Sequence, residues 1–584
     1  MRAMFCCLVL IGIAVSPACG EIRVDFVMDR DPDLTPPEPV KVFSEKLLPL
    51  WLKALARPEA EMQRMAAQSI AQAHALKLPR VHEAQPALLK IVSAEEAHPA
   101  ARYAAARAII VLEAQETASI LLETSQRHGA EFRQLVEPVL ARWKFEPANH
   151  VWQKRLSMPN TNLRDLILAI RCVREAEVDS SVEALLAIAH DPFRPVSVRR
   201  EAARSAGALR SSGLEENARR FENTASAVIF DRLCAVALLD RHRSKSAEEA
   251  LSRLAQDVEP SIAAAALASL NANDPSLVVP LAEQVMRNDD ANVRQQGVLA
   301  FAARPTPERV TVMARLLDDP HTGVRATVRE SLFRLTRTPE LDSPIRAAAV
   351  SVLAGGGWRG QEQAALLLAA LDHKPIAGRL VELLESPRGE VMISAAWGLR
   401  QLALPETLPA ILDKATRQSD VRKKAPPPDA LDVQVGLLCE AMGQMKYVPA
   451  EGLLRRYIPK DYEMGELSRC AAIWSLGHLH AGVPDEGLAQ LLFDRLTDPG
   501  TMPPEMDRVR IMSIISMARM KTRTQFEPMR KVLAPTYVPT FRSMAFRWAM
   551  KEMTGEEIPL PMPSVQQLNG WFLEPLEELP SETK

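Results

Sequence analysis

The chain of 584 residues is poor in aromatic side chains and has no large excess of charge of either sign. Aromatic residues make up 5% of it and strand-forming residues are scarce, which disfavours a β-rich core. The formal net charge is −2, so the whole chain lacks the basic surface that binds nucleic acid or an anionic membrane. We therefore expect no nucleic-acid partner, although a local basic groove stays open because arginine recurs along the chain.

Cysteine is also sparse. Beyond the first twenty residues only Cys172, Cys234, Cys439 and Cys470 remain, and all four fall in segments with a helical pattern. A small exported protein that depends on disulfides has denser, paired cysteines. We expect buried free thiols, with Cys439 and Cys470 in neighbouring repeats and close enough to meet.

Sequence motifs for catalysis and for metal or cofactor binding are missing. The chain contains no G-x-S-x-G, no G-x-x-x-x-G-K-[ST], no C-x-x-C and no H-E-x-x-H. The segment Gly355–Gly360 matches G-x-G-x-x-G, but the residues before it are Ala-rich and helical rather than a strand. We interpret it as a flexible loop that displays Trp358. The closest histidines, His478 and His480, lie on different faces of a helix. We predict no catalytic residue, no metal site and no cofactor.

A short phrase recurs along most of the chain: an apolar residue, often followed by Arg, and then a small residue. It is clearest at Val293-Arg294 and at Val324-Arg325, 31 residues further on. The same register falls on Met62, Ala101, Phe132, Leu163, Val198, Asp231, Ile262, Gln361, Val391, Val433, Leu467, Val509 and Phe541. Most steps are 30 to 37 residues and three are near 40. Such a period indicates stacked helix pairs.

Each repeat predicts a helix, a short turn, a second helix and a break that contains Asp or Pro. Asp191-Pro192 and Asp318-Asp319-Pro320 are such breaks, a few residues before the Val-Arg phrase. Asp suits the start of a helix, and Pro is tolerated in its first turn. In the second helix at Val198, apolar and small residues recur at helical spacing.

The Asp-Pro turns, with Val198-Arg199 and Ala202-Ala203 or with Val324-Arg325 after them, resemble the HEAT repeat family, in its bacterial HEAT-like form that also occurs in pigment lyases. The resemblance covers residues 46–554 and is strongest over 190–335. It implies an all-α fold, a right-handed superhelical α-α solenoid of roughly fifteen helix pairs. In that family the second helices line a concave face that often holds a partner.

Arginines occupy one position of the repeat. They are Arg102, Arg133, Arg164, Arg199, Arg232, Arg294, Arg325, Arg510 and Arg542. Guanidinium groups in such a row could grip carboxylates or phosphates. They could equally bind the Asp side chains or carbonyls of neighbouring turns and join repeat to repeat.

From this row we take Arg199, Arg232, Arg294 and Arg325, together with Trp358, as candidate partner-binding residues. Three further tryptophans fall within second helices: Trp397, Trp474 and Trp548. Tryptophans at these positions of a second helix are core residues, or they anchor a partner peptide if they face the concave surface.

Residues 1–20 have the pattern of a signal peptide: Arg2, an apolar run over 5–15, and small residues around Cys19. We expect export to the periplasm, cell envelope or extracellular space, with membrane attachment only if Cys19 is lipidated. We predict a Pro-rich linker over 21–45, the solenoid over 46–554 and a Pro-rich acidic tail over 555–584. The tail contains Trp571 and Phe572, which we expect to cap the last repeat. A basic, Pro-rich insertion around 425–428 predicts an exposed loop.

These observations predict an exported, non-enzymatic scaffold that binds other, unidentified proteins along a concave face. Two alternatives stay open. One is a repeat-based enzyme resembling the pigment lyases, for which no catalytic residue can be named. The other is a lipid-anchored scaffold of the cell envelope.

Overall fold

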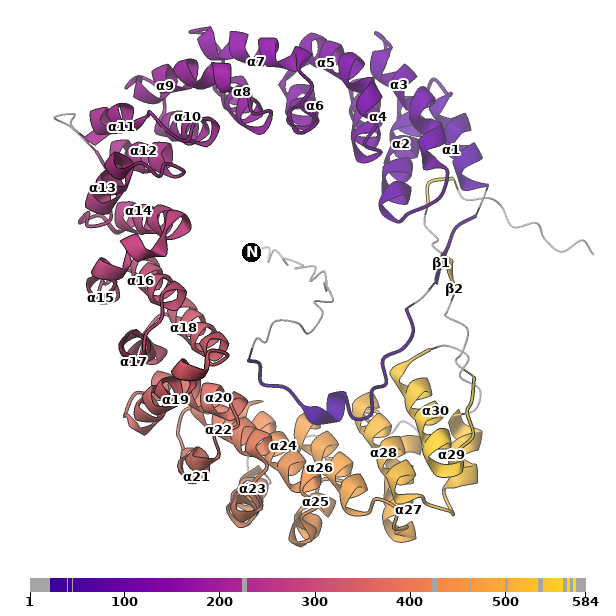
Figure 1. Cartoon of the computed structure of the whole chain (residues 1–584). Coiled ribbons are helices and arrows are strands. Elements are labelled where there is room, and N and C mark those ends of the chain that lie inside the picture. Colours follow the sequence, from indigo (N-terminus) through magenta and orange to yellow (C-terminus); the bar gives the residue numbers. More distant parts are fainter. Residues whose placement is uncertain are drawn as a thin grey trace, which may run out of the picture. The chain divides into compact units, whose positions relative to one another are not determined.

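The computed structural model describes residues 22–38, 40–44, 46–222, 228–422, 429–461, 464–498, 503–533, 539–559, 565–567 and 571–573. These residues form thirty α-helices, short 3-10 turns and two short strands (Figure 1). The helices follow one another as fifteen pairs, which confirms the all-α solenoid expected from the repeat. Among the described helices, none has the length and apolar character needed to cross a membrane.

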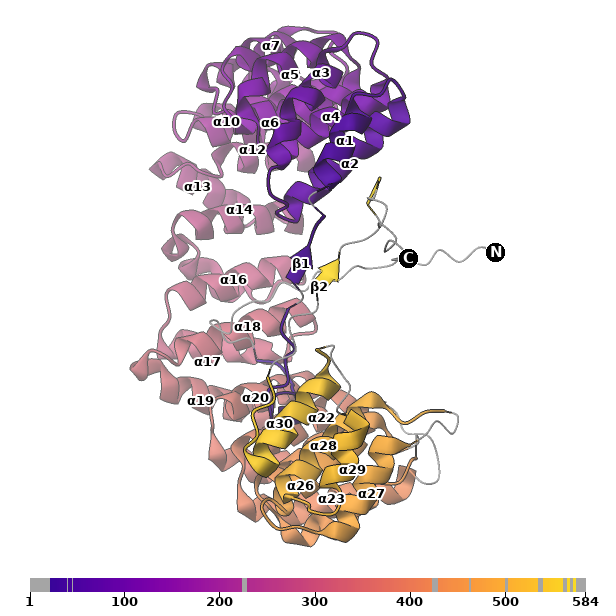
Figure 2. The same cartoon turned by 90° about the vertical axis from the view of Figure 1, so that its right-hand side faces the viewer.

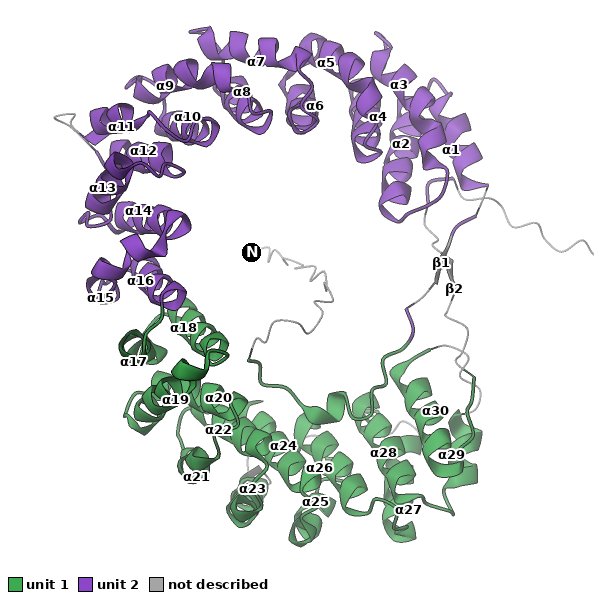
Figure 3. Ribbon diagram, in the orientation of Figure 1, with its two compact units in different colours: residues 1–36, 305–561 green, residues 37–304, 562–584 purple. Residues whose placement is uncertain are grey.

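The chain divides into two compact units, and each unit includes a segment from the opposite end of the sequence (Figure 3). Unit 1 comprises residues 1–36 and 305–561, and unit 2 comprises residues 37–304 and 562–584. The N-terminal segment is thus part of the C-terminal unit, and the C-terminal tail is part of the N-terminal unit.

Unit 2 holds the first sixteen helices. They are α1 (Leu47–Leu55), α2 (Ala60–Ala75), α3 (Gln85–Ser93), α4 (Pro99–Val111), α5 (Ala118–Arg127), α6 (Ala130–Arg142), α7 (Pro147–Ser157), α8 (Leu163–Glu175), α9 (Val182–His190), α10 (Val196–Leu209), α11 (Glu215–Glu222), α12 (Ile229–Leu239), α13 (Lys245–Leu254), α14 (Pro260–Asn273), α15 (Ala282–Val285) and α16 (Ala291–Ala303).

Unit 1 holds the remaining fourteen and the 3-10 turn η1 (Val27–Asp29). They are α17 (Pro307–Ala314), α18 (Thr322–Leu335), α19 (Pro339–Ala354), α20 (Trp358–Ala370), α21 (Ala377–Leu383), α22 (Gly389–Leu402), α23 (Leu408–Arg422), α24 (Asp429–Gln444), α25 (Glu451–Arg455), α26 (Glu466–Leu479), α27 (Glu486–Thr497), α28 (Asp507–Met520), α29 (Phe526–Leu533) and α30 (Phe541–Thr554).

Within each unit the even-numbered helices, the second of each pair, pack side by side as an inner row (Figure 1). Small residues let these helices approach closely. A Cβ added to Gly443 of α24 would lie 2.6 Å from the Cβ of Ser475 in α26, and one added to Gly477 would meet Ser516 of α28 in the same way. Such contacts leave no room for a larger side chain. The Ala-rich, aromatic-poor composition therefore fits this packing.

Some turns after second helices contain a residue in the left-handed conformation that the sequence does not indicate. Glu113, Glu177 and Asp372 each follow a second helix and have a φ of 53°, 57° and 51°. This left-handed region ends helices and is usually occupied by Gly or Asn. Here charged residues occupy it, at a modest conformational cost, so a search for Gly at helix ends misses these turns.

The two chain ends differ from our expectations. The predicted linker over 21–45 is not a free connection, since residues 22–36 pack on unit 1 and Val40–Val42 forms strand β1. Strand β1 pairs in parallel with β2 (Val565–Gln567), which lies beside it in Figure 2. The predicted signal peptide and the insertion around 425–428 lie outside the described residues.

Trp571 and Phe572 of the tail contact the first repeat, not the last as we expected, while Glu556 and Glu557 at the start of the tail pair with Arg530 of α29 and Lys551 of α30. Trp571 is buried, and its ring centroid lies 5.3 Å from that of Trp51 in α1. Trp51 also donates a 2.6 Å hydrogen bond from Nε1 to the carbonyl of Phe572. A buried indole N–H needs an acceptor, and the tail supplies it. The tail therefore covers the first helix pair, which has no preceding repeat to pack against it.

Candidate functional site

An extended segment of the chain, residues 22–36, lies along the inner row of unit 1. In Figure 1 it runs across α22, α24, α26 and α28, the second helices of four successive pairs. Ile22, Met28 and Leu34 of this segment are buried. We call this segment the inner strap. It shows directly which side chains of the inner row hold an extended chain.

Asp25 of the inner strap is held by α22. Arg400 donates to its carbonyl at 2.6 Å and to its Oδ1 at 2.7 Å, and Trp397 Nε1 donates to the same Oδ1 at 3.1 Å. Burial alone would raise the pKa of Asp25, but the hydrogen bonds from Arg400 and Trp397 outweigh it and hold the pKa below its ordinary value. Asp25 is thus fixed as a carboxylate.

Arg400 joins the inner strap to α24 through Glu440. Its Nη1 lies 2.8 Å from Glu440 Oε2, and both side chains are completely buried. The other oxygen of Glu440 accepts a 2.7 Å hydrogen bond from the backbone N–H of Met28. Burial raises the pKa of Glu440, while the Arg400 charge and the Met28 N–H oppose the rise. Both oxygens of Glu440 are thus hydrogen-bonded in a buried site, in which the Nε of Arg400 has no hydrogen-bond partner among the described residues.

Asp31 is held by α26 and α28. Trp474 Nε1 donates to its carbonyl at 2.9 Å, and Arg519 lies 2.8 Å from its Oδ1. His478 Nε2 is 3.0 Å from Oδ2. Burial would raise the pKa of Asp31, and the His478 hydrogen bond together with the Arg519 charge brings it below the ordinary value. Between Asp25 and Asp31, Asp29 pairs with Arg508 of α28.

Two tryptophans of the second helices are core residues that also bind the chain's own N-terminal segment, and their contact with a partner peptide stays a prediction. Trp397 and Trp474 are buried, and each donates its indole N–H to the inner strap. Arg519 lies over the ring of Trp474, at 5.4 Å from the centroid, and over that of Trp548, at 5.7 Å. The signal for this site in the sequence was the placement of Trp in second helices; its arginine and carboxylate partners were missed.

The repeated arginines join turns and repeats. Arg294 and Arg325 are buried and donate to the carbonyls of the preceding turn, at Asn288 and Asp319. Arg199 binds Asp231 of the next repeat at 2.5 Å and Arg232 binds Asp257 at 2.7 Å. These four arginines thus bond to neighbouring turns, whereas Arg164 of the same row is exposed. Partner binding by Arg199, Arg232, Arg294 and Arg325 stays a prediction.

Trp358 is placed differently from the expected flexible loop. It is the first residue of α20, so only Gly355–Gly357 connects α19 to α20. The N–H of Gly360 donates to Asp318 Oδ1 at 2.8 Å, which fixes this turn. The guanidinium groups of Arg359 and Arg388 lie 4.6 and 4.1 Å from the centroid of the Trp358 ring. Its contact with a partner stays a prediction.

The four cysteines of the described helices are buried thiols rather than disulfides, as expected. Burial raises the pKa of Cys234 to about 11 and that of Cys172 further still. Neither is a reactive thiolate at neutral pH.

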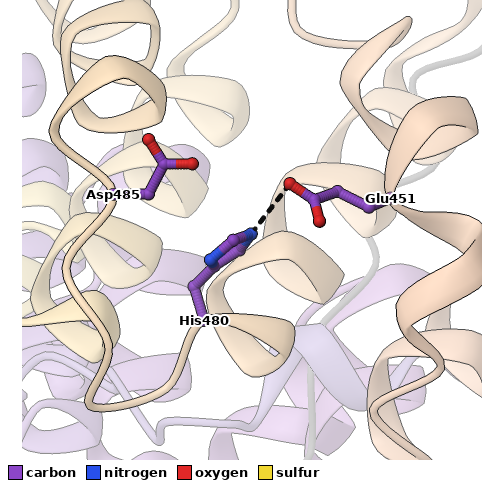
Figure 4. Close-up of side chains that lie close together, drawn as sticks. All are labelled: Glu451, His480 and Asp485. Carbon is purple, nitrogen blue, oxygen red and sulfur yellow. Dashed lines mark hydrogen bonds and ion pairs between the residues drawn. The ribbon is translucent and has the colours of Figure 1, made fainter.

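One group of potential metal ligands occurs in the described part of the chain: Glu451, His480 and Asp485, with ligand atoms within 4.8 Å of one another (Figure 4). His480 Nε2 lies 3.1 Å from Glu451 Oε1. Arg455 Nη2, however, is 2.7 Å from Glu451 Oε1 and 2.5 Å from Asp485 Oδ2. One guanidinium already pairs with both carboxylates, so the group forms an ion-pair network between α25 and the N-cap of α27.

Comparison with known proteins yields likeness in structure alone. No protein-family profile and no curated protein sequence matches the chain. Kap95p, in a structure with RanGDP, is 11% identical with a TM-score of 0.49, over 87% of this chain and 72% of Kap95p. Importin beta is 13% identical with a TM-score of 0.44, over 87% and 77%. Kap121p is 12% identical with a TM-score of 0.47, over 87% and 56%. By its own helix pairs and their stacking, the chain is an α-solenoid.

Proposed function

We propose that this chain is an exported, non-enzymatic scaffold that binds extended segments of other proteins along its inner rows of helices. The inner strap is the observation that carries the proposal. Side chains from four successive second helices hold this segment, which is extended on either side of the turn η1, by ion pairs, indole N–H donors and buried apolar side chains. Each unit has an inner row of this kind, and its repeating geometry suits recognition of a linear segment.

The inner strap also shows the chemistry that this surface prefers. Its anchors are aspartates, and the groups that hold them are Arg400, Arg508 and Arg519. Charged hydrogen bonds of this kind are stronger than neutral ones and fix orientation as well as affinity. A scaffold built in this way needs no catalytic residue, which agrees with the missing motifs.

Export rests on the composition of residues 1–20. Cleavage after Gly20 would leave the whole inner strap at the start of the mature chain, with Ile22 buried close to the new terminus. Mass determination of the mature N-terminus tests this part: a chain that starts near Glu21 supports export as a soluble protein. A start at a lipidated Cys19 supports the anchored form, and an uncleaved Met1 contradicts export.

Protein binding is tested with a photoreactive amino acid at one inner and one outer position of the full chain, in the cells that produce it. Tyr103 of α4 is 41% exposed on the inner row, and Leu491 of α27 is 46% exposed on the outer row. The proposal predicts a discrete cross-linked protein from position 103 and none from position 491. Equal labelling from both positions, or none from position 103, contradicts it.

A further inference from the structure

A pocket opens on the inner row of unit 2, between α2, α4, α6 and α8, and has a volume of about 900 Å³. These four helices follow one another along the inner row in Figure 1. Its charged lining is Arg64, Arg102, Arg107 and Arg164 against a single carboxylate, Glu131. His98 and His128 complete the polar wall. The pocket therefore carries an excess of positive charge although the chain as a whole does not.

Two of the four arginines are engaged in the fold. Arg102 is only 3% exposed, and its Nη2 donates to the carbonyls of Ala94 and Glu95 at 2.8 and 3.0 Å. Its Nε is buried without a hydrogen-bond partner among the described residues. Arg64 pairs with Glu61 and donates to Gln68 at 2.9 Å.

The other two are available to a ligand. Arg107 of α4 and Arg164 of α8 are exposed, and neither guanidinium makes an ion pair or hydrogen bond to the described chain. Helix α6 begins at the pocket with Gly129 before it and no side chain capping its first N–H groups. Uncapped N–H groups and the helix dipole favour an anion at this end.

His128 adds no fixed charge to this wall. Burial lowers its pKa, and the charges of Arg102 and Arg127 lower it further. The positive potential of the pocket therefore comes from arginine and persists across neutral pH, where guanidinium groups keep their charge.

We propose that this pocket binds a Glu- or Asp-rich extended segment of a partner protein, with a carboxylate between Arg107 and Arg164 and the Tyr103 ring beside it. The inference rests on the proposed function and names the partner's chemistry. Unit 1 supplies the internal example, because there the inner row holds the Asp-rich inner strap with arginine and aromatic side chains. In unit 2, Arg107, Arg164 and Tyr103 of the inner row line an open pocket.

The test measures binding of a fluorescein-labelled twelve-residue peptide of alternating Glu and Ser to the full chain, by fluorescence anisotropy at 150 mM salt. The same peptide with Gln in place of Glu is the charge control. Arg107→Glu/Arg164→Glu should weaken binding of the Glu peptide by about tenfold or more. Arg315→Glu/Arg337→Glu makes the same charge change at exposed arginines of unit 1 and should leave affinity within about twofold.

Three outcomes overturn the proposal. They are equal binding of the Glu and Gln peptides, equal loss in both double variants, and pocket-dependent binding of inorganic phosphate or an RNA oligonucleotide without binding of the peptide. Far-UV circular dichroism of both variants establishes that they are folded. If the cross-link at position 103 persists while the peptide does not bind, the scaffold function stands and this assignment of partner chemistry fails.

Discussion

Arg400 is the residue on which the inner strap depends most, and Arg400→Met tests its role. The substitution keeps an unbranched, though shorter, side chain and removes the charge that faces Glu440 at 2.8 Å and Asp25 at 2.7 Å. Since Glu440 is completely buried, it is left as a carboxylate without a cation. Breaking a buried pair in this way costs about 3–5 kcal/mol.

The companion variant separates charge from packing. Arg400→Met/Glu440→Gln removes both charges, and the amide oxygen introduced at position 440 can still accept from the N–H of Met28. The double variant should therefore recover about half or more of the loss, because the desolvated charge is gone. Arg417→Met is the control, since Arg417 pairs with Glu385 on the surface and is worth about 1 kcal/mol or less.

Urea unfolding, followed by far-UV circular dichroism and by tryptophan fluorescence, to which Trp397 and Trp474 contribute, measures these differences. Both indoles donate to the inner strap, so their emission reports its release together with the unfolding of unit 1. The reasoning is refuted if Arg400→Met costs no more than Arg417→Met. It is also refuted if the double variant is no more stable than Arg400→Met alone.

Three further predictions concern the strap, the helix contacts and the tail. The pKa values of Asp25 and Asp31 in the folded chain lie below the ordinary 3.8. The stability that these carboxylates contribute is therefore present above pH 3.8 and is lost as the pH falls through their folded pKa values. Tryptophan emission should accordingly shift below about pH 4, and the shift should be smaller in Asp31→Asn. Gly443→Ala should lower the free energy of unfolding by about 1–3 kcal/mol, because the added Cβ would collide with α26. Gly452→Ala, which has open space at its Cβ, should stabilise the fold slightly. Thermal melts compare the two variants. Trp571→Ala should free the tail and expose the first helix pair, so that limited proteolysis removes the tail faster than from the unaltered chain; equal rates would contradict the contact.

The repeating part of the fold could be predicted from the sequence because its contacts are local. The Val-Arg phrase and the Asp-Pro turns predicted helix pairs from residue 46 to 554, and the structure places α1 from Leu47 and the end of α30 at Thr554. In a solenoid each pair contacts mainly its neighbours, so a periodic pattern carries nearly all the information. The left-handed turn at Glu113 is an exception, since it lacks the usual Gly.

The inner strap and the tail could not be predicted in this way. Asp25 and Arg400 are 375 positions apart, and Trp51 and Phe572 are 521 apart. Such contacts have no period, and a Pro-containing segment with scattered aspartates has the composition of a linker. The buried tryptophans of the inner row were the one visible signal, because an indole N–H in a buried position requires an acceptor.

Hydrogen–deuterium exchange of the inner strap in the full chain tests the central claim most directly. The account predicts slow exchange over residues 26–31, above all at the Met28 N–H bound to the buried Glu440, and fast exchange there in Arg400→Met. Exchange of these amides at the rate of an unstructured peptide in the unaltered chain would contradict an inner row that holds extended segments.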